Sequence, residues 1–203
     1  MSAPEPLNLI VTGVGGQGNV LISQIIGKAL VDKGFKVAVG ETFGLSQRGG
    51  AVQSHIRISR EKIFGPLIPE GRAHVVLGLE PLETLRILPQ FGGPDVQIIV
   101  NSRPLPPLNA SAGEAVYPNE KILKAALTEL SAKLWWVNGS SAAAKLGSAI
   151  MTNIVLLGAL VGTGLIPLEP EELEKAMQAL LSPEKLKKNF TAFRKGMKLT
   201  APN

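Results

Sequence analysis

Residues 13–18 are Gly13-Val14-Gly15-Gly16-Gln17-Gly18, and this glycine loop separates two apolar segments with different periods. Before the loop, Leu7 to Thr12 is a mostly apolar run with the length of a buried strand. After it, apolar residues recur at helical spacing as far as Leu30, and Gly34 can end that helix. A second short strand pattern, Lys36 to Gly40, completes a strand-loop-helix-strand unit. Such a unit predicts that its two strands pair in parallel through a right-handed crossover.

The rest of the chain continues to alternate between strand and helix patterns. Ala51 to Ile58 has a period of two, with apolar residues on one face and Gln53, His55 and Arg57 on the other, which is typical of a half-buried strand. Further segments are predicted as strands at 74–79, 96–100 and 134–137, and as helices at 82–88 and 120–132. We therefore expect one α/β domain over residues 1–203. It should be a doubly wound, mostly parallel, Rossmann-like sheet with helices on both faces and a helical segment beyond Ser140.

The composition limits the chemistry that the chain can perform alone. The 203 residues include no cysteine, which excludes disulfides, iron–sulfur ligation and thiolate zinc sites within the chain. We expect no metal site here, and any redox metal centre to belong to a partner. The formal net charge is +5, but only 18% of residues are charged and 4% aromatic, which does not favour nucleic-acid binding. Residues 185–198 carry much of the basic excess, as a solvated helix or as a surface for an acidic partner.

One uncharged segment has the length of a membrane span. Leu146 to Leu168 contains no charged residue, but Asn153, Pro167 and the series Gly158, Gly162 and Gly164 interrupt it, which favours a helix buried in protein. The first residues, Met1 to Pro6, have neither the basic nor the apolar region of a secretory signal. We therefore expect a cytoplasmic protein without a membrane anchor.

The glycine loop by itself allows more than one nucleotide-binding interpretation. Gly13 and Gly18 have the outer spacing of a Walker A loop, but Asn19 and Val20 stand where that motif needs lysine and serine or threonine, so a triphosphatase is not favoured. The spacing also fits the dinucleotide fingerprint, and Glu41 lies almost where the ribose-binding acid is expected. An NAD(P)-dependent dehydrogenase and a non-catalytic nucleotide-binding or scaffold module both remain possible. A purely structural strand-to-helix turn also fits.

Several motifs together give a more specific signal than the glycine loop. Residues 11–18 are followed by Gly40-Glu41, Gly44, Ser46-Gln47-Arg48-Gly49-Gly50 and residues 54–57. In this order the motifs resemble the gamma domain of 2-oxoacid:ferredoxin oxidoreductases. The resemblance covers nearly the whole chain, including Asn153 and residues 189–193.

The resemblance implies the subunit of a larger enzyme. The family decarboxylates a 2-oxoacid on thiamine diphosphate, transfers electrons through [4Fe–4S] clusters to ferredoxin and forms an acyl-CoA. This chain lacks the glycine-aspartate-glycine motif that would hold thiamine diphosphate and Mg²⁺, and it has no cluster ligands. The resemblance therefore implies a hetero-oligomer in which a larger partner binds these cofactors, CoA is a co-substrate, and the isolated chain is inactive.

The second glycine motif points to one branch of that family. The pyruvate and oxoglutarate branches tend to have aromatic-glycine-proline-glutamate before arginine-glycine-glycine, whereas residues 43–48 here are Phe-Gly-Leu-Ser-Gln-Arg. That departure favours the indolepyruvate-like branch. Aryl pyruvate, branched-chain oxoacid and pyruvate all remain possible substrates, because the pocket that selects among them lies largely outside this chain.

Three groups of residues are candidates for the functional site. Arg48, within Ser46-Gln47-Arg48-Gly49-Gly50, either orders a subunit interface or contacts the substrate or CoA through its bidentate guanidinium. His55 is a candidate base, although a lone histidine on a strand face is more often a structural hydrogen-bonding group. The remaining candidates form the first loop, which either binds the CoA diphosphate or packs against the partner: Gly13, Gly15, Gly16, Gln17, Gly18 and Asn19.

Overall fold

The computed structural model describes residues 4–44, 50–106 and 116–201. Within these ranges the chain forms a six-stranded sheet with the strand order β2-β3-β1-β4-β5-β6. The bounds of the strands are β1 Leu7–Val14, β2 Lys36–Phe43, β3 Ala51–Ser59, β4 Val75–Gly78, β5 Gln97–Asn101 and β6 Lys133–Val137. Strands β1, β4, β5 and β6 pair in parallel, so the prediction of a mostly parallel sheet is confirmed.

One part of the predicted topology is wrong. Strands β1 and β2 do not pair with each other, because β3 lies between them and is antiparallel to both. The register joins Val11 of β1 to Ser54 of β3, and Glu41 of β2 to that same Ser54. The β2–β3 hairpin therefore folds back into the sheet and separates β2 from the rest of the expected strand-loop-helix-strand unit.

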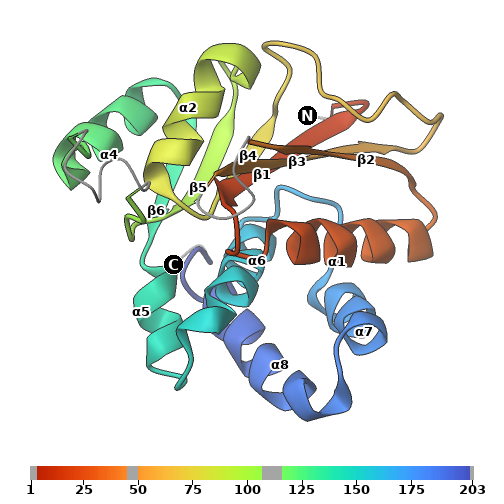
Figure 1. Ribbon diagram of the computed structural model, residues 1–203. Coiled ribbons are helices and arrows are strands. Elements are labelled where there is room, and N and C mark those ends of the chain that lie inside the picture. The colour runs from red at the N-terminus through yellow and green to blue at the C-terminus, as the bar shows by residue number, and fades with distance from the viewer. Residues whose placement is uncertain (1–3, 45–49, 107–115, 202–203) are drawn as a thin grey trace.

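Helices cover both faces of the sheet, as the sequence predicts (Figure 1). One face carries α1, α5, α6, α7 and α8, and the other carries α2 and α4. The helices have these bounds: α1 Asn19–Asp32, α2 Pro81–Phe91, α4 Glu120–Glu129, α5 Gly139–Ala144, α6 Thr152–Gly162, α7 Pro170–Leu180 and α8 Pro183–Met197. A short 3₁₀ turn, η1 Ala149–Met151, precedes α6.

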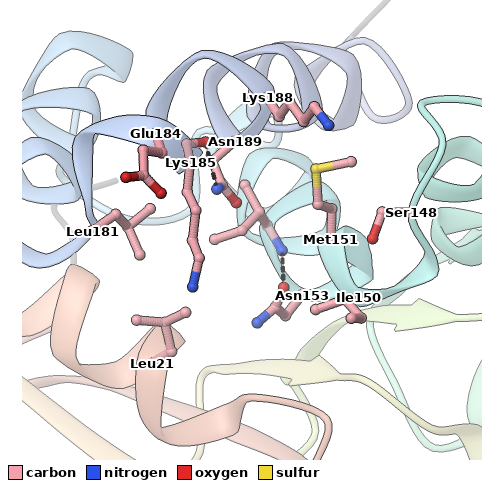
Figure 2. Close-up of a pocket in the computed structure, with 11 residues that line it drawn as sticks. Leu21, Ser148, Ile150, Met151, Asn153, Leu181, Glu184, Lys185, Lys188 and Asn189 are labelled. Atoms are coloured by element: carbon pink, nitrogen blue, oxygen red, sulfur yellow. Dashed lines mark hydrogen bonds between the residues drawn. The ribbon is translucent and has the colours of Figure 1, made fainter.

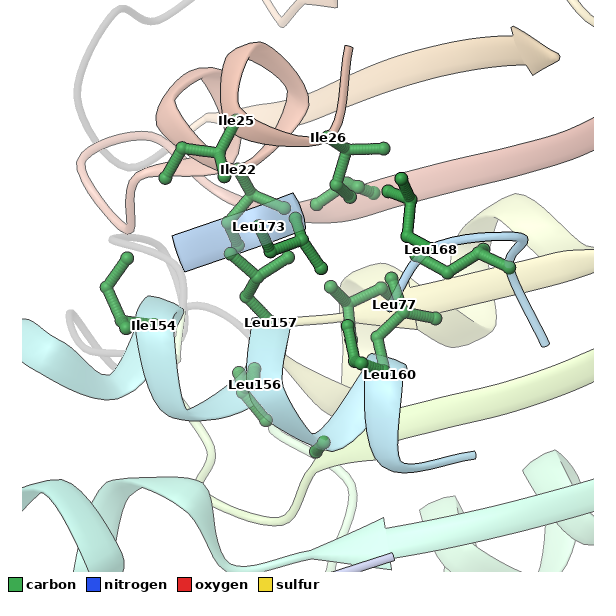
Figure 3. Packing of buried hydrophobic residues seen from close by; sticks show 14 of the residues in the cluster. Ile22, Ile25, Ile26, Leu77, Ile154, Leu156, Leu157, Leu160, Leu168 and Leu173 are labelled. Atoms are coloured by element: carbon green, nitrogen blue, oxygen red, sulfur yellow. The ribbon is translucent and has the colours of Figure 1, made fainter. Parts of the chain in front are cut away.

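The larger core lies between the sheet and the helices that follow β6. Apolar side chains of α1 and α6 meet Leu77 of β4 and Leu173 of α7 in this layer (Figure 3). Helix α6 is buried along its length, so its apolar sequence belongs to the core of the domain. Among the described residues, no helix has both the length and the apolar character needed to cross a membrane.

Glycines allow α6 and α8 to cross at backbone contact. A Cβ added at Gly158 would lie 2.0 Å from the carbonyl oxygen of Phe193, and one at Gly196 would lie 1.9 Å from that of Val155. Any larger residue at either position would push the two helices apart. This close crossing holds the start of α6 beside α1 and the N-terminal part of α8, where the candidate site lies.

Candidate functional site

The glycine loop connects β1 to α1 and takes its shape from two left-handed residues. Gly16 and Gly18 have φ angles of +97° and +89°, a region that favours glycine. Gly18 is the N-cap of α1, and a Cβ added there would lie 2.3 Å from Nδ2 of Asn153 on α6. At Gly16 an added Cβ would meet no heavy atom within 4 Å. The loop is therefore in contact with α6 at Gly18 and open at Gly16.

Polar side chains fix this loop to the neighbouring strands. Oε1 of Gln17 accepts a hydrogen bond from the Val14 N–H at 2.7 Å, and Nε2 donates to the Leu79 carbonyl at 3.2 Å. Asn19 Nδ2 donates to the carbonyl of Val52 at 3.2 Å, and Asn19 is buried. Because these side chains bond to the protein itself, the loop presents mainly its glycine backbone and the N-terminus of α1 to a ligand.

The structure does not support Glu41 as a ribose ligand. In the dinucleotide fold the acid ends a strand next to β1, whereas here β3 separates the two strands. Glu41 is consequently displaced by one further strand spacing, about 4.8 Å. Its Oε1 instead accepts a hydrogen bond from Ser23 Oγ of α1 at 3.1 Å.

A cleft of about 480 Å³ opens at the carboxyl ends of β1, β4 and β5. Ligands of open α/β sheets bind at this edge. Asn101 lies at the floor of the cleft and is 1% exposed. It donates hydrogen bonds to the Leu79 carbonyl at 3.3 Å and to Ser140 Oγ at 3.0 Å, which connects the segments after β4 and β6. The wall is formed by the glycine loop, the start of α6 and the segment after β5, represented by Gly16, Gly18, Arg103, Leu105, Thr152 and Asn153.

A second cavity, of about 430 Å³, adjoins this cleft through Ile150 and Asn153, which line both. It lies between α1, the start of α6 and the N-terminal part of α8, and Lys185 extends across it towards Leu21 (Figure 2). Glu184 and Lys188 also line the cavity. Ile150 is 88% exposed, so an apolar side chain stands at the junction of the two cavities.

Several donor groups along these connected cavities have no acceptor among the described residues. The Arg103 guanidinium and the Lys185 ammonium make no ion pair or hydrogen bond with any residue that the structure describes. Asn153 is only 7% exposed; its Oδ1 accepts from the Ile154 N–H at 2.8 Å, but its Nδ2 donates to no described atom. Together with the N-terminus of α1, they offer unpaired donors of the kind that an anionic ligand accepts from.

A buried carboxylate supports the Arg103 side of the cleft. Glu80, 1% exposed, is the N-cap of α2, and its Oε2 accepts from the Glu83 N–H at 2.8 Å. Its Oε1 accepts from the Leu105 N–H at 3.3 Å and from the Tyr117 hydroxyl. Burial, together with the hydrogen bond to Glu80, raises the pKa of Tyr117, so the phenol keeps the proton that it donates.

The structure places His55 and Arg57 away from the cleft. Residues 65–68 pass over this strand face at Arg57 and His55. The expectation of a half-buried polar face therefore holds at Gln53 and Arg57, which stay partly exposed, and is wrong at His55, which is buried. His55 is 1% exposed, accepts from the Ile68 N–H at 3.3 Å and packs edge-on against Phe91. Burial lowers the pKa of His55. Arg57 donates to Asn8 and to the carbonyls of Gly65 and Leu67, an arrangement that holds the covering segment in place.

Most of the second glycine motif, Ser46 to Gly49 with Arg48, lies outside the described residues. Its last residue, Gly50, accepts a hydrogen bond from the Gly15 N–H at 2.8 Å. The two glycine motifs therefore meet directly. Within the described residues no group of His, Asp or Glu side chains could hold a metal ion.

Sequence reasoning did not identify Arg103 or Lys185 as site residues. They come from segments more than 80 positions apart and belong to no local motif. Asn153 was noticeable as a polar residue in an otherwise apolar helix, which is the signal that could have placed it in a site.

Comparison with known proteins identifies the family. The family model described as pyruvate ferredoxin/flavodoxin oxidoreductase matches residues 8–199. The chain belongs to this family. It is 37% identical, over 94% of both chains, to the indolepyruvate oxidoreductase subunit IorB of Pyrococcus horikoshii. Its identity to the 2-oxoglutarate synthase subunit KorC of Archaeoglobus fulgidus is 26%, over 97% of this chain and 89% of that one.

Solved structures with this fold include other members of the oxidoreductase group. The gamma subunit of a keto/oxoacid ferredoxin oxidoreductase from Geobacter sulfurreducens superposes with a TM-score of 0.67 at 22% identity, covering 96% of this chain and 98% of that one. A 2-oxoglutarate:ferredoxin oxidoreductase from Magnetococcus marinus, solved with 2-oxoglutarate, CoA and succinyl-CoA bound, gives a TM-score of 0.73 at 19% identity. That superposition covers 97% of this chain and 31% of the longer one. Both superpositions show that this chain shares the α/β fold of those structures.

Proposed function

We propose that this chain is the gamma-type subunit of a 2-oxoacid:ferredoxin oxidoreductase with an indolepyruvate-like substrate. The observation that carries the proposal is the 37% identity to an indolepyruvate oxidoreductase subunit over 94% of both chains, against 26% to an oxoglutarate synthase subunit. The absence of cysteine from the sequence agrees with a subunit that relies on another chain for its clusters. In this proposal a larger partner holds thiamine diphosphate, Mg²⁺ and [4Fe–4S] clusters, ferredoxin accepts the electrons, and this chain alone is inactive.

The connected cavities are proposed as the site for the phosphates of CoA. Arg103 at one end, the N-terminus of α1 with Asn153 in the middle and Lys185 at the other end offer donors to several phosphates at once. Ile150 and Leu105, both exposed and apolar, can contact the uncharged parts of such a ligand. A phosphate in the second cavity is drawn towards Lys185 and away from the carboxylate of Glu184. CoA is one of the three ligands bound in the Magnetococcus marinus enzyme, beside 2-oxoglutarate and succinyl-CoA, which supports this assignment.

The proposed CoA site is tested by charge removal in the reconstituted complex. Arg103→Ala and Lys185→Ala should each raise the KM for CoA by about tenfold, equivalent to about 1.4 kcal/mol, with a much smaller effect on the KM for the 2-oxoacid. Lys121→Ala, an exposed lysine of α4 on the opposite face of the sheet, is the matched control and should leave both values unchanged. An unchanged KM for CoA in both cleft variants would remove the cleft from the proposal.

The subunit assignment itself is tested by partner recovery and by ligand choice. Purification at native expression levels should recover a larger chain that contains thiamine and iron. Titration of this chain with NAD or NADP should show no micromolar binding, because Glu41 bonds to Ser23 and is displaced from β1. A solitary, fully active protein, or tight binding of NAD, contradicts the assignment. A scaffold without a catalytic contribution predicts instead that Arg48→Ala leaves turnover of the complex unchanged.

A further inference from the structure

We propose that Glu80 and Tyr117 are positioning residues that hold one wall of the cleft in its ligand-binding arrangement. This inference rests on the proposed function of the cleft. The wall is the segment Arg103 to Leu105, which follows β5. One buried carboxylate, that of Glu80, bonds to Leu105 in this segment and to Tyr117, which precedes α4.

Glu80 is held in place by hydrogen bonds at the start of α2. Its Oε2 is held by the N–H of Glu83, and its main-chain carbonyl accepts from the Thr84 hydroxyl at 2.7 Å. Both are hydrogen bonds of the first turn of α2, a helix that packs its apolar face into the core of that side of the sheet. The position of Oε1 is therefore set by the rigid part of the domain.

No cation among the described residues pairs with the carboxylate of Glu80. In the described part of the chain, Arg86 pairs with Glu83 at 2.6 Å, and Glu80 has no ion pair. A carboxylate that is 1% exposed needs donated hydrogen bonds to replace its hydration. Leu105 N–H and Tyr117 O–H supply those bonds to Oε1. These two hydrogen bonds to the buried carboxylate therefore hold the Leu105 segment and the Tyr117 segment against the start of α2.

The hydrogen bond between Glu80 and Leu105 lies next to residues that line the cleft. Leu105 lines the cleft and lies two residues beyond Arg103, which also lines it. Arg103 lies between two main-chain anchors: the Ser102 N–H donates to the Val137 carbonyl at 2.7 Å, and the Leu105 N–H donates to Glu80. Because no described residue bonds to the Arg103 side chain, these anchors restrain where its guanidinium enters the cleft, and Glu80 supplies the one on the Leu105 side. Neither Glu80 nor Tyr117 lines the cleft, so both act through the segment that they hold.

The experiment compares Tyr117→Phe with Thr84→Val in the reconstituted complex. Each variant removes one hydroxyl that donates to Glu80, but only the tyrosine donates to the carboxylate oxygen that also holds Leu105. Tyr117→Phe should raise the KM for CoA about fivefold with little change in kcat, because ligand-site geometry is lost rather than chemistry. Thr84→Val should lower the thermal midpoint and leave the KM for CoA unchanged. Glu80→Gln should show the KM effect more strongly, because its amide group opposes the donors.

Hydrogen exchange of the Leu105 amide provides a readout that does not depend on CoA. It should be faster in Tyr117→Phe than in the wild-type chain and unchanged in Thr84→Val. Unchanged exchange at Leu105 in Tyr117→Phe, or faster exchange with an unchanged KM for CoA, overturns the positioning role. An unchanged KM for CoA in Arg103→Ala is a different result: it contradicts the proposed function of the cleft, and exchange at Leu105 still reports on the anchor.

Discussion

The contact between the glycine loop and α6 can be measured with two matched substitutions, Gly16→Ala and Gly18→Ala. Both glycines have left-handed backbone conformations, with φ angles of +97° and +89°. An alanine in that region costs about 1–2 kcal/mol. The same replacement restricts the unfolded chain, which offsets about 0.4–1 kcal/mol of that cost. Gly16→Ala, where the new Cβ meets no atom within 4 Å, should therefore lower the free energy of unfolding by about 1 kcal/mol.

Gly18→Ala should cost more, because its Cβ would lie 2.3 Å from Nδ2 of Asn153. The Asn153 side chain must rotate away, and it then gives up the hydrogen bond between its Oδ1 and the Ile154 N–H. A hydrogen bond of this kind contributes about 1 kcal/mol, so the total loss should be about 2 kcal/mol. The difference between the two variants, about 1 kcal/mol, is the part that belongs to the contact between the loop and α6.

Urea unfolding of the full chain, followed by far-ultraviolet circular dichroism, measures these differences. Each substitution is made in the wild-type chain and in the Asn153→Ala background, where the side chain that obstructs the new methyl group is absent. The excess cost at Gly18 should disappear in that background, while the cost at Gly16 should not change. Equal losses at the two glycines, or an excess at Gly18 that persists without Asn153, would refute the reasoning.

Two further predictions concern the core and its histidines. Gly196→Ala should lower the free energy of unfolding by more than about 3 kcal/mol, which is beyond the usual range for a point substitution. The reason is that its Cβ would lie 1.9 Å from the Val155 carbonyl oxygen. Denaturant unfolding measures the loss, and the control is Gly147→Ala, at a glycine with a left-handed backbone and open space around it. The pKa values of His55 and His74 are both lowered by burial, so the unfolded chain binds more protons than the folded chain below about pH 6.5. Stability should therefore fall as the pH is lowered from 7.5 to 5.5, and a flat profile across that interval would contradict the assignment of both histidines as neutral in the folded chain.

Local patterns predicted the elements of the fold because their periods are properties of short segments. The strand predicted at Ala51 to Ile58 is β3, Ala51–Ser59, and the helix predicted from Glu120 is α4. Period alone does not specify which strands are neighbours, since pairing depends on contacts between distant segments. The insertion of β3 between β1 and β2 was missed for that reason.

The assignment of the polar face of β3 failed for a related reason. Gln53, His55 and Arg57 alternate with buried residues as in a strand that faces water, but the segment after β3 passes over His55 and Arg57. Ile68 and Ala73, which are buried in the smaller core, are the residues of that segment that could have indicated the cover. The candidate site was missed for the same reason, because Arg103, Asn153 and Lys185 are distant in sequence and line connected cavities only in the tertiary fold.

The inserted strand explains why a dinucleotide-like loop in this chain need not serve a dinucleotide. If β2 were paired with β1, Glu41 would end the strand next to the loop and could reach a ribose. With β3 in that place, the residue brought against the loop is Gly50, whose carbonyl accepts from the Gly15 N–H. A main-chain acceptor thus occupies this side of the loop. Unpaired donors lie on its other side: Arg103 after β5, Asn153 Nδ2 on α6 and Lys185 on α8. The sheet order is therefore consistent with the proposed function, in which phosphate binds on the α6 side of the loop, where the two cavities meet, and not on the β2 side.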